Sequence, residues 1–238
     1  MKIDMIAEET KSNSSELDEV VYHISHDLRA SVRALQDLPG WLNDDLAETG
    51  VMLEGETAAT LGLIQSHARR LDEMLSGLLS YSRVGRLQEP VTVQPQEVFS
   101  SVLAELAPSE DVTFFAQLNP VAIRMGKSDV ARLFQVLLSN AMRHAGPGPN
   151  IEITSCRSGD VWELLISDNG PGIPETYKRD IFKPMVKLVS RDEDEGGGMG
   201  LAVLQKIVEH YRGTVHVEDR VRLGGVTFRV RLPVVVEG

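Results

Sequence analysis

The sequence predicts an α+β protein in which an N-terminal helical hairpin precedes an α/β sandwich. The N-terminal third carries two long stretches whose apolar residues recur at helical spacing. After the proline-containing segment 85–95, the pattern changes to short alternating runs, typical of strands, between amphipathic helices. We therefore place the domain boundary in that segment and expect the later helices to cover one face of a largely antiparallel sheet.

The first helix is expected from about Ser14 or Ser15, which offer N-cap oxygens, to about Leu38. Its apolar residues alternate spacings of four and three, and Ser31 fills the one missing step. A seam of this kind is typical of a helix that packs against other helices. The seam consists of Leu17, Val21, Ile24, Leu28, Leu35 and Leu38.

The segments on either side of this helix differ in character. Residues 1–16 are polar and are interpreted as a leader or as the end of a missing input module. Pro39–Gly40 is expected to interrupt or end the helix, and residues 41–50 to continue it with a bend. After a turn at 50–55, a second helix is expected over 56–84. Its seam consists of Leu61, Ile64, Ala68, Leu71, Leu75 and Leu78.

Two such helices joined by a connector form an antiparallel hairpin. A single hairpin cannot bury both of its apolar faces, whereas two hairpins can, as a four-helix bundle. We therefore expect a homodimer through this region. The alternative is an intramolecular pair that packs on the downstream domain.

The downstream region is expected to alternate helices and strands. The resulting organisation is 1–16 as leader or module end, 17–86 as hairpin, 87–94 as linker and 95–238 as the second domain. The expected helices are 95–106, 128–144 and 200–211, and the expected strands are 112–115, 121–125, 151–156, 161–167, 214–217 and 226–232.

The composition excludes several classes of function. The chain has 24 basic and 35 acidic residues, a net charge of −11, which argues against a nucleic-acid or anionic-membrane partner. Cys156 is the single cysteine, so no internal disulfide can form. The sequence has no signal peptide and no run of about 18 apolar residues. We therefore expect a cytoplasmic protein without a membrane span.

A histidine beside the first seam is the first candidate for chemistry. His26 lies off the seam, next to Asp27 and close to Arg29. A neutral imidazole is a good nucleophile near pH 7, and a neighbouring carboxylate can orient it and take its proton. His23, one turn earlier, is the competing acceptor and lacks a following carboxylate.

Polar side chains end the helix expected over 128–144. The amide oxygen of Asn140 is a hard neutral ligand, suited to Mg²⁺. Arg143 and His144 could reach phosphate oxygens. A helical asparagine near a C-terminus is more often a cap, so the motif alone leaves both interpretations open.

Two glycine-rich segments follow. Residues 168–173 read Asp-Asn-Gly-Pro-Gly-Ile directly after a strand, where a carboxylate can bond an exocyclic amine, as on adenine, and glycines admit a flat ring. An ordinary turn is the alternative. Residues 196–202 read Gly-Gly-Gly-Met-Gly-Leu-Ala and lead into a helix, which favours an anion cradle over a flexible linker. Residues 183–195 are polar and are interpreted as a mobile lid.

In order and spacing, these motifs resemble those of the kinase core of two-component sensor histidine kinases, from about Leu17 to Pro233. The similar segments are His26–Arg29 (the H-box), Leu138–Ala141 with Arg143–Ala145 (the N-box), Asp168–Ile173 (the first glycine box), Ile181–Pro184 (the F-box), Gly196–Leu201 (the second glycine box) and Gly225–Phe228 (the closing segment).

The resemblance implies a dimeric histidine-phosphotransfer hairpin and an ATP-binding GHKL, or Bergerat, sandwich. It implies that His26 and Asp27 are catalytic and that Asn140 holds Mg²⁺. The ATP-binding residues that it implies are Asn140, Arg143, His144, Asp168, Gly170, Gly172, Ile173, Phe182, Gly196, Gly198, Met199, Gly200, Leu201 and Thr227.

The implied reaction is autophosphorylation of His26 from Mg-ATP, then transfer to an aspartate of a response regulator receiver domain. The implied partners are a second copy of the chain, that receiver domain and an upstream sensory module. Whether phosphate moves within or across the dimer would depend on the handedness of the connection near 39–55.

Three departures from the family pattern are visible. Ala30 stands where the family often has Thr or Asn to position a water for dephosphorylation of the regulator, so we predict weak phosphatase activity. Ser31 replaces the proline that commonly follows. Val136 stands where a second polar residue often precedes Asn140 by one turn, and a metal or base contact is then missing.

Three other functions are compatible with parts of this pattern. The first is a phosphotransfer adaptor of the same architecture that does not bind ATP, which the intact glycine segments argue against. The second is a serine/threonine kinase or an ATP-driven switch that shares only the sandwich. The third is a coiled-coil dimeriser with an inert domain, which leaves the glycine segments unexplained.

Overall fold

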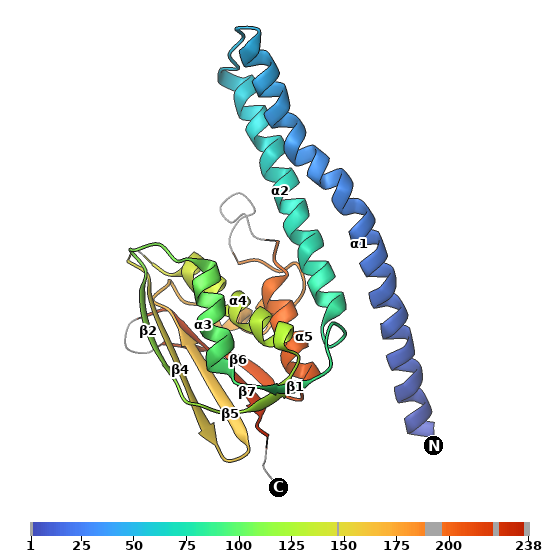
Figure 1. The fold of residues 1–238 in the computed structure, drawn as a ribbon, viewed down its shortest axis with the longest axis vertical. Helices are drawn as coiled ribbons and strands as arrows, with labels where there is room; N and C mark the ends of the chain where they lie inside the picture. The colour runs from blue at the N-terminus through green and yellow to red at the C-terminus, as the bar shows by residue number, and fades with distance from the viewer. Residues whose placement is uncertain (1, 147, 189–196, 221–223, 236–238) are drawn as a thin grey trace. The chain divides into compact units, whose positions relative to one another are not determined.

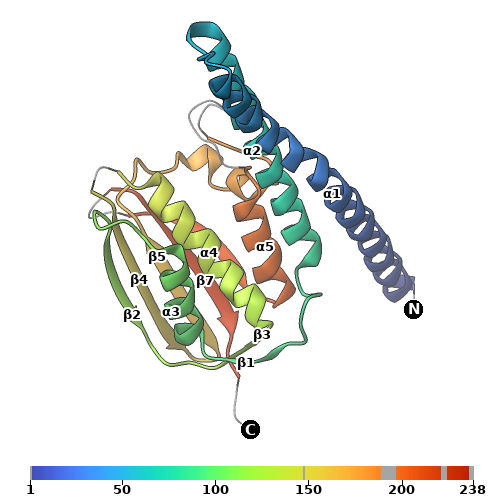
Figure 2. The ribbon, with the colours of Figure 1, turned by 45° about the horizontal axis from the view of Figure 1, so that its top comes forward.

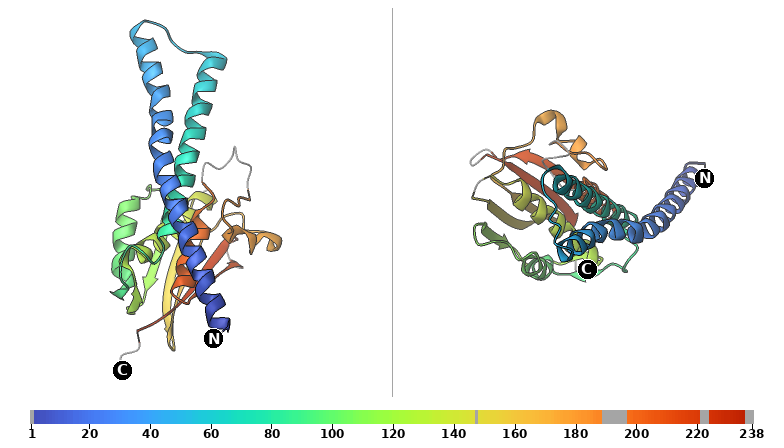
Figure 3. Two further views of the ribbon diagram at one scale, coloured as in Figure 1. Left: turned by 90° about the vertical axis from the view of Figure 1, so that its right-hand side faces the viewer. Right: turned by 90° about the horizontal axis from the view of Figure 1, so that it is seen from above.

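The computed structural model describes residues 2–146, 148–188, 197–220 and 224–235, with side chains from residue 20 onward (Figure 1). The chain divides into two compact units, one of residues 1–83 with 189–199 and one of residues 84–188 with 200–238. The first unit is built on α1 (Lys2–Glu48) and α2 (Gly55–Arg83), which run antiparallel and are joined at their far ends (Figure 3). The predicted hairpin is therefore present.

The first helix is longer than the sequence analysis expected. α1 begins at Lys2, inside the segment interpreted as a leader, and continues through Pro39 to Glu48. A proline removes one backbone hydrogen bond and disfavours the preceding turn, but it does not end a helix whose neighbouring turns are held by packing. Pro39 is buried, so tertiary packing outweighs its local cost.

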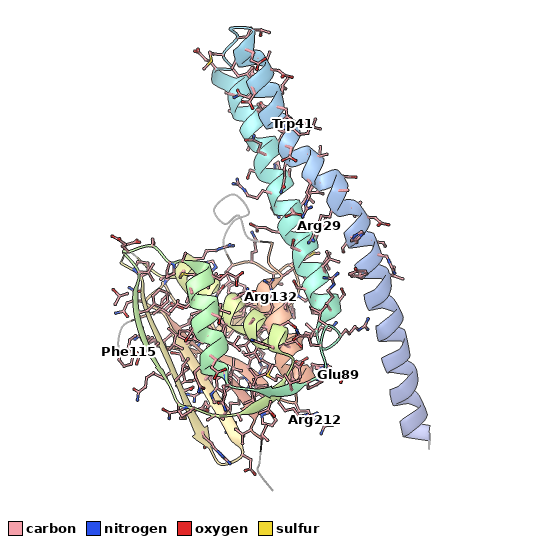
Figure 4. The ribbon with its side chains drawn as sticks, viewed as in Figure 1. Arg29, Trp41, Glu89, Phe115, Arg132 and Arg212 are labelled. Atoms are coloured by element: carbon pink, nitrogen blue, oxygen red, sulfur yellow. The ribbon has the colours of Figure 1, made fainter. Side chains whose placement is uncertain are left out.

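From residue 20 onward, the buried residues of α1 are Ser25, Val32 and Pro39, which do not belong to the expected seam. They are seven residues apart, and Ala68 and Leu75 of α2 keep the same spacing. Arg29 of α1 adds a hydrogen bond from its guanidinium to Ser76 Oγ of α2, at 2.8 Å (Figure 4).

Four of the six residues of the expected seam lie on a second, exposed face of α1. We call this face the apolar stripe; its members are each between 46% and 54% exposed, although they are large hydrophobic side chains. The prediction that α1 carries an apolar seam thus holds for Ile24, Leu28, Leu35 and Leu38, which share this exposed face. The apolar stripe consists of Val20, Ile24, Leu28, Leu35, Leu38 and Leu42.

The second unit is a five-stranded sheet in the order β2-β4-β5-β7-β6, with β2 parallel to β4 and the other pairs antiparallel. Three helices cover one face of it (Figure 2). The helices are α3 (Pro95–Leu106), α4 (Lys127–His144) and α5 (Gly200–His210), and the strands are β2 (Thr113–Leu118), β4 (Asn150–Ser158), β5 (Val161–Ser167), β6 (Thr214–Asp219) and β7 (Val226–Pro233).

Smaller elements complete this unit. β1 (Val91–Val93) pairs antiparallel with β3 (Ile123–Met125), and two short 3₁₀ helices, η1 (Glu175–Tyr177) and η2 (Asp180–Phe182), follow β5. The predicted α+β sandwich is confirmed, and the bounds of the expected elements differ by a few residues at most. β1 was not expected, because it lies in the segment 87–94 that was interpreted as a linker.

The core of this unit lies between the helices and the sheet. Phe134 of α4 packs edge-on against Phe99 of α3 and Trp162 of β5, with ring centroids 5.5 and 6.4 Å away. Along β5 and β7, alternate residues are buried, which identifies one covered face of the sheet. None of the helices described combines the length and the apolarity needed to cross a bilayer.

Candidate functional site

His26 is displayed on the surface of α1. Its side chain is 67% exposed, and its Nδ1 lies 3.2 Å from Oδ1 of Asp27. Among the residues that the structure describes, this is the one hydrogen bond that His26 makes. A ring whose Nδ1–H donates to a carboxylate presents the unprotonated Nε2, with its lone pair, to the outside.

The apolar stripe and His26 lie on opposite faces of α1. The members of the stripe lie within about 40° of Ile24 around the helix axis, whereas His26 lies about 200° from it. A partner that covers the stripe would therefore leave the imidazole accessible.

His23 is exposed as well but has different surroundings. Its ring meets the edge of the Tyr22 ring at a centroid distance of 5.3 Å. It makes no ion pair with any residue in the described part of the chain. Of the two candidate acceptors, only His26 has a carboxylate held against its ring.

Asp168 is the centre of the candidate site in the second unit. It follows β5 directly and is 3% exposed, and its Oδ1 accepts a hydrogen bond of 2.9 Å from the backbone N–H of Gly170. Burial raises the pKa of the Asp168 carboxyl, and the backbone of Gly170 and Val226, together with His144 and Arg220, offsets only part of that rise. Because these donors do not fully offset the burial, the carboxylate would gain from a further donor such as a ligand amine.

Two glycines permit the chain to close around Asp168. A Cβ at Gly170 would overlap the carbonyl oxygen of His144, and a Cβ at Gly225 would overlap the backbone of Asp168. Gly225 also has a φ of +79°, which disfavours other residues. The end of α4, the loop after β5 and the start of β7 therefore meet at Asp168. Gly225 was expected only as part of the closing segment and not as a residue against Asp168.

The structure does not bring Thr227 to the covered face of the sheet. Its Oγ1 lies 2.8 Å from Oγ of Ser167, and both side chains belong to the other face. Val226 and Phe228, which flank Thr227, point to the covered face and are 5% and 1% exposed. The residue on that face next to Gly225 is thus Val226, which sequence reasoning missed and strand alternation could have indicated.

The start of α5 packs against the middle of α4. A Cβ at Gly200, the first residue of α5, would be 3.5 Å from Cγ1 of Val136. Asn140, one turn after Val136, is half-buried, and its amide makes no hydrogen bond with another described residue. The free backbone N–H groups of the first turn of α5 are suited to an anion.

The other predicted site residues have varied surroundings. Gly198, two residues before α5, has a φ of +67°, and Gly172 has a φ of +85°. Phe182 packs edge-on against Phe228, at 6.4 Å between centroids, and so belongs to the core. Gly196 and most of the segment interpreted as a lid lie outside the described residues. Arg143 and His144 are exposed, Ile173, Gly198 and Leu201 are half-buried, and Met199 is buried.

The described residues are compatible with Mg²⁺ shared between the protein and phosphate oxygens. In the described ranges, no three His, Cys, Asp or Glu side chains form a group that could hold a metal ion. Mg²⁺ is commonly bound by one or two protein oxygens together with phosphate oxygens. Asn140 fits that arrangement, because its amide has no partner among the described residues and it lies one turn along α4 from Val136, the residue near Gly200.

Comparisons with known proteins agree with this geometry. Residues 126–236 match the family described as histidine kinase-, DNA gyrase B- and HSP90-like ATPases. The chain is 28% identical to the methanogenesis regulatory histidine kinase FilI of Methanothrix harundinacea, over 89% of the chain, and 25% identical to the phytochrome-like protein Cph1 of Synechocystis, over 98% of it. It spans only 24% of FilI and 31% of Cph1.

A solved structure extends the likeness to both units. The histidine kinase ThkA, in complex with the response regulator protein TrrA, aligns with a TM-score of 0.65 and 20% sequence identity. The alignment covers 97% of this chain and 66% of that one. At this identity, the likeness concerns the fold.

Proposed function

From its resemblance to sensor histidine kinases along nearly its whole length, we propose that this chain is a kinase core that transfers the γ-phosphoryl group of ATP to His26. The observation that supports this most directly is the exposed imidazole whose Nδ1 is held by Asp27. The test is incubation with Mg-ATP, followed by mass spectrometric location of phosphohistidine.

In this proposal the nucleotide occupies the site around Asp168. The carboxylate accepts a hydrogen bond from the exocyclic amine of adenine, because it is buried and its present donors offset only part of that burial. The backbone N–H groups at the start of α5 bind the phosphates. Asn140 would hold Mg²⁺, which would supply positive charge to neutralise the transferred group.

The proposed chemical step is an in-line displacement. The lone pair on Nε2 of His26 forms a bond to the γ-phosphorus, and the bond from that phosphorus to the bridging oxygen breaks, so that ADP leaves with the electron pair. The Nδ1 proton passes to Asp27 and then to solvent, which leaves a neutral phosphoramidate ring. Because that bond is labile, it suits onward transfer.

The proposed acceptor of the second transfer is an aspartate of a response regulator receiver domain. The alignment with ThkA, whose structure includes a response regulator, supports this partner for the present chain. An upstream sensory module is proposed as well, since the chain spans only a minor share of its curated relatives.

We propose further that the chain dimerises through the apolar stripe. Six large hydrophobic side chains, each about half exposed in one copy, form a continuous face along α1. α2 adds Leu63, Ile64 and Leu71, which are also more than two-fifths exposed. Two hairpins that bury these faces against each other would form a four-helix bundle, with His26 outside the buried faces.

Replacement of Leu28 by glutamate is expected to convert the dimer into a monomer. Each buried leucine side chain contributes about 1.5–3 kcal/mol, and a two-fold interface loses it twice. Sedimentation velocity at micromolar concentration measures the outcome. Arg33→Glu, on the face of α1 that carries His26, is the matched control and should leave a dimer; a monomeric wild-type chain would contradict the proposal.

The wild-type chain is expected to dephosphorylate its regulator slowly. Ala30 follows His26 by one turn and has no hydrogen-bonding group to position a water molecule. Ala30→Thr should therefore accelerate the loss of phosphate from the phosphorylated regulator, whereas Ala34→Thr, one turn further along α1, should not. Rapid loss of phosphate with the unmodified chain would show that Ala30 does not limit the reaction.

A further inference from the structure

Tyr22 lies one helical turn before His26 and contacts it. The two rings are offset-stacked, with centroids 6.2 Å apart and an angle of 29° between their planes. Residues four apart lie on the same face of a helix, which places the two rings next to each other. Tyr22 is half-buried, whereas His26 is exposed.

Arg83 of α2 holds the Tyr22 ring in place. Its guanidinium donates a hydrogen bond of 2.9 Å to the phenol oxygen, and its Cζ lies 4.7 Å from the centre of the ring. These are a charge-assisted hydrogen bond and a cation–π contact. The two contacts fix a side chain on α1 from the last residue of α2.

The orientation of the His26 imidazole is therefore restricted by two contacts. Asp27 binds Nδ1, and the Tyr22 ring covers part of one face. An exposed histidine would otherwise sample several rotamers, and a nucleophile that must attack in line loses rate in proportion to the time that it spends elsewhere.

We propose that Tyr22 is a positioning residue for His26 and that Arg83 fixes its ring. This proposal rests on the proposed phosphorylation of His26 and names a residue beyond the implied catalytic pair. Because Arg83 is the last residue of α2, a change in the end of that helix would alter how His26 is presented.

The alternative is that Tyr22 only fills space in the hairpin. Tyr22→Leu separates the two roles, because leucine keeps apolar bulk but has no ring to stack. We expect Tyr22→Leu to lower the kcat of autophosphorylation about tenfold with no change in the KM for ATP, since positioning affects the chemical step rather than nucleotide binding.

A double-mutant cycle tests the role of Arg83. Tyr22→Phe keeps the ring and loses the phenol oxygen, and Arg83→Gln loses the guanidinium. Each should lower kcat by less than Tyr22→Leu. The double variant should be no slower than Arg83→Gln, because Arg83→Gln already removes the hydrogen bond that Tyr22→Phe removes. Arg33→Gln removes a positive charge from α1 and should leave kcat unchanged.

Nuclear magnetic resonance of the chain without nucleotide supplies a readout that is independent of kinase activity. Loss of the Tyr22 ring in Tyr22→Leu should shift the ring protons of His26 and leave those of His67, on α2, unchanged. If the wild-type chain takes no phosphate from ATP, the proposed function fails, and these shifts then test only whether the Tyr22 ring contacts the His26 ring. Unaltered His26 resonances, an unchanged kcat in Tyr22→Leu or a change confined to KM would overturn it.

Discussion

Replacement of His26 by glutamine is expected to abolish the incorporation of labelled phosphate from ATP. Glutamine preserves polarity and approximate length but has no nucleophilic nitrogen, since an amide lone pair is delocalised. The loss should be complete because His26 is proposed to supply the only atom that bonds to phosphorus. Acid treatment before counting should also release the label from the wild-type chain, because a phosphoramidate is acid-labile, unlike phosphoserine or phosphothreonine.

His23→Gln is the matched control for this prediction. His23 is exposed on the same helix, three residues earlier, and lacks a carboxylate held against its ring. Its replacement should leave most of the labelling intact. Undiminished labelling of the His26 variant would refute the assignment, and labelling that disappears only in the His23 variant would transfer the role to His23.

Asp168→Asn is expected to weaken the binding of an ATP analogue by about 100-fold, since a hydrogen bond to a charged acceptor contributes about 1.5–3 kcal/mol. Asparagine still accepts from the N–H of Gly170, but its amide nitrogen would face the exocyclic amine with a second donor. A fluorescent ATP analogue, titrated against both chains, measures the change.

The same substitution is expected to stabilise the chain without nucleotide at neutral pH. Burial raises the pKa of Asp168, so the folded state binds its proton more tightly than the unfolded state. The charged carboxylate therefore destabilises the fold above the raised pKa, and this penalty disappears as the pH falls below the ordinary value. The difference in melting temperature between the variant and the wild type should be positive at pH 7 and vanish in acid.

Asp160→Asn is the control for both effects. Asp160 lies exposed in the turn between β4 and β5, at the other end of β5 from Asp168. It should change neither nucleotide affinity nor the pH dependence of stability. Unchanged analogue binding by Asp168→Asn would contradict the proposed adenine contact, and absent binding by the wild type would favour the adaptor without ATP.

The sequence predicted elements well where periodicity was strong. α3 was expected and found from Pro95 to Leu106, and β5 from Val161 to Ser167. The errors came where tertiary packing outweighed a local signal. Pro39 is the clearest case, because a residue that usually breaks helices is held inside α1 by the hairpin.

In the candidate site, too, local pattern predicted some positions and packing decided others. Asp168 was expected at the end of a strand, and its position after β5 follows from the alternation of that strand. The face to which Thr227 points was not anticipated, because a shift of one residue along β7 exchanges the two faces of the sheet. Val226 is consequently the residue on the covered face.

The sequence by itself determined that two helices with apolar seams precede an α+β sandwich, and that a histidine with a carboxylate neighbour lies off the first seam. Only the tertiary structure decided that Ser25, Val32 and Pro39 are buried while the apolar stripe stays exposed. The physical reason is that spacing along a helix identifies which residues share a face, whereas the partner of each face depends on where distant parts of the chain pack.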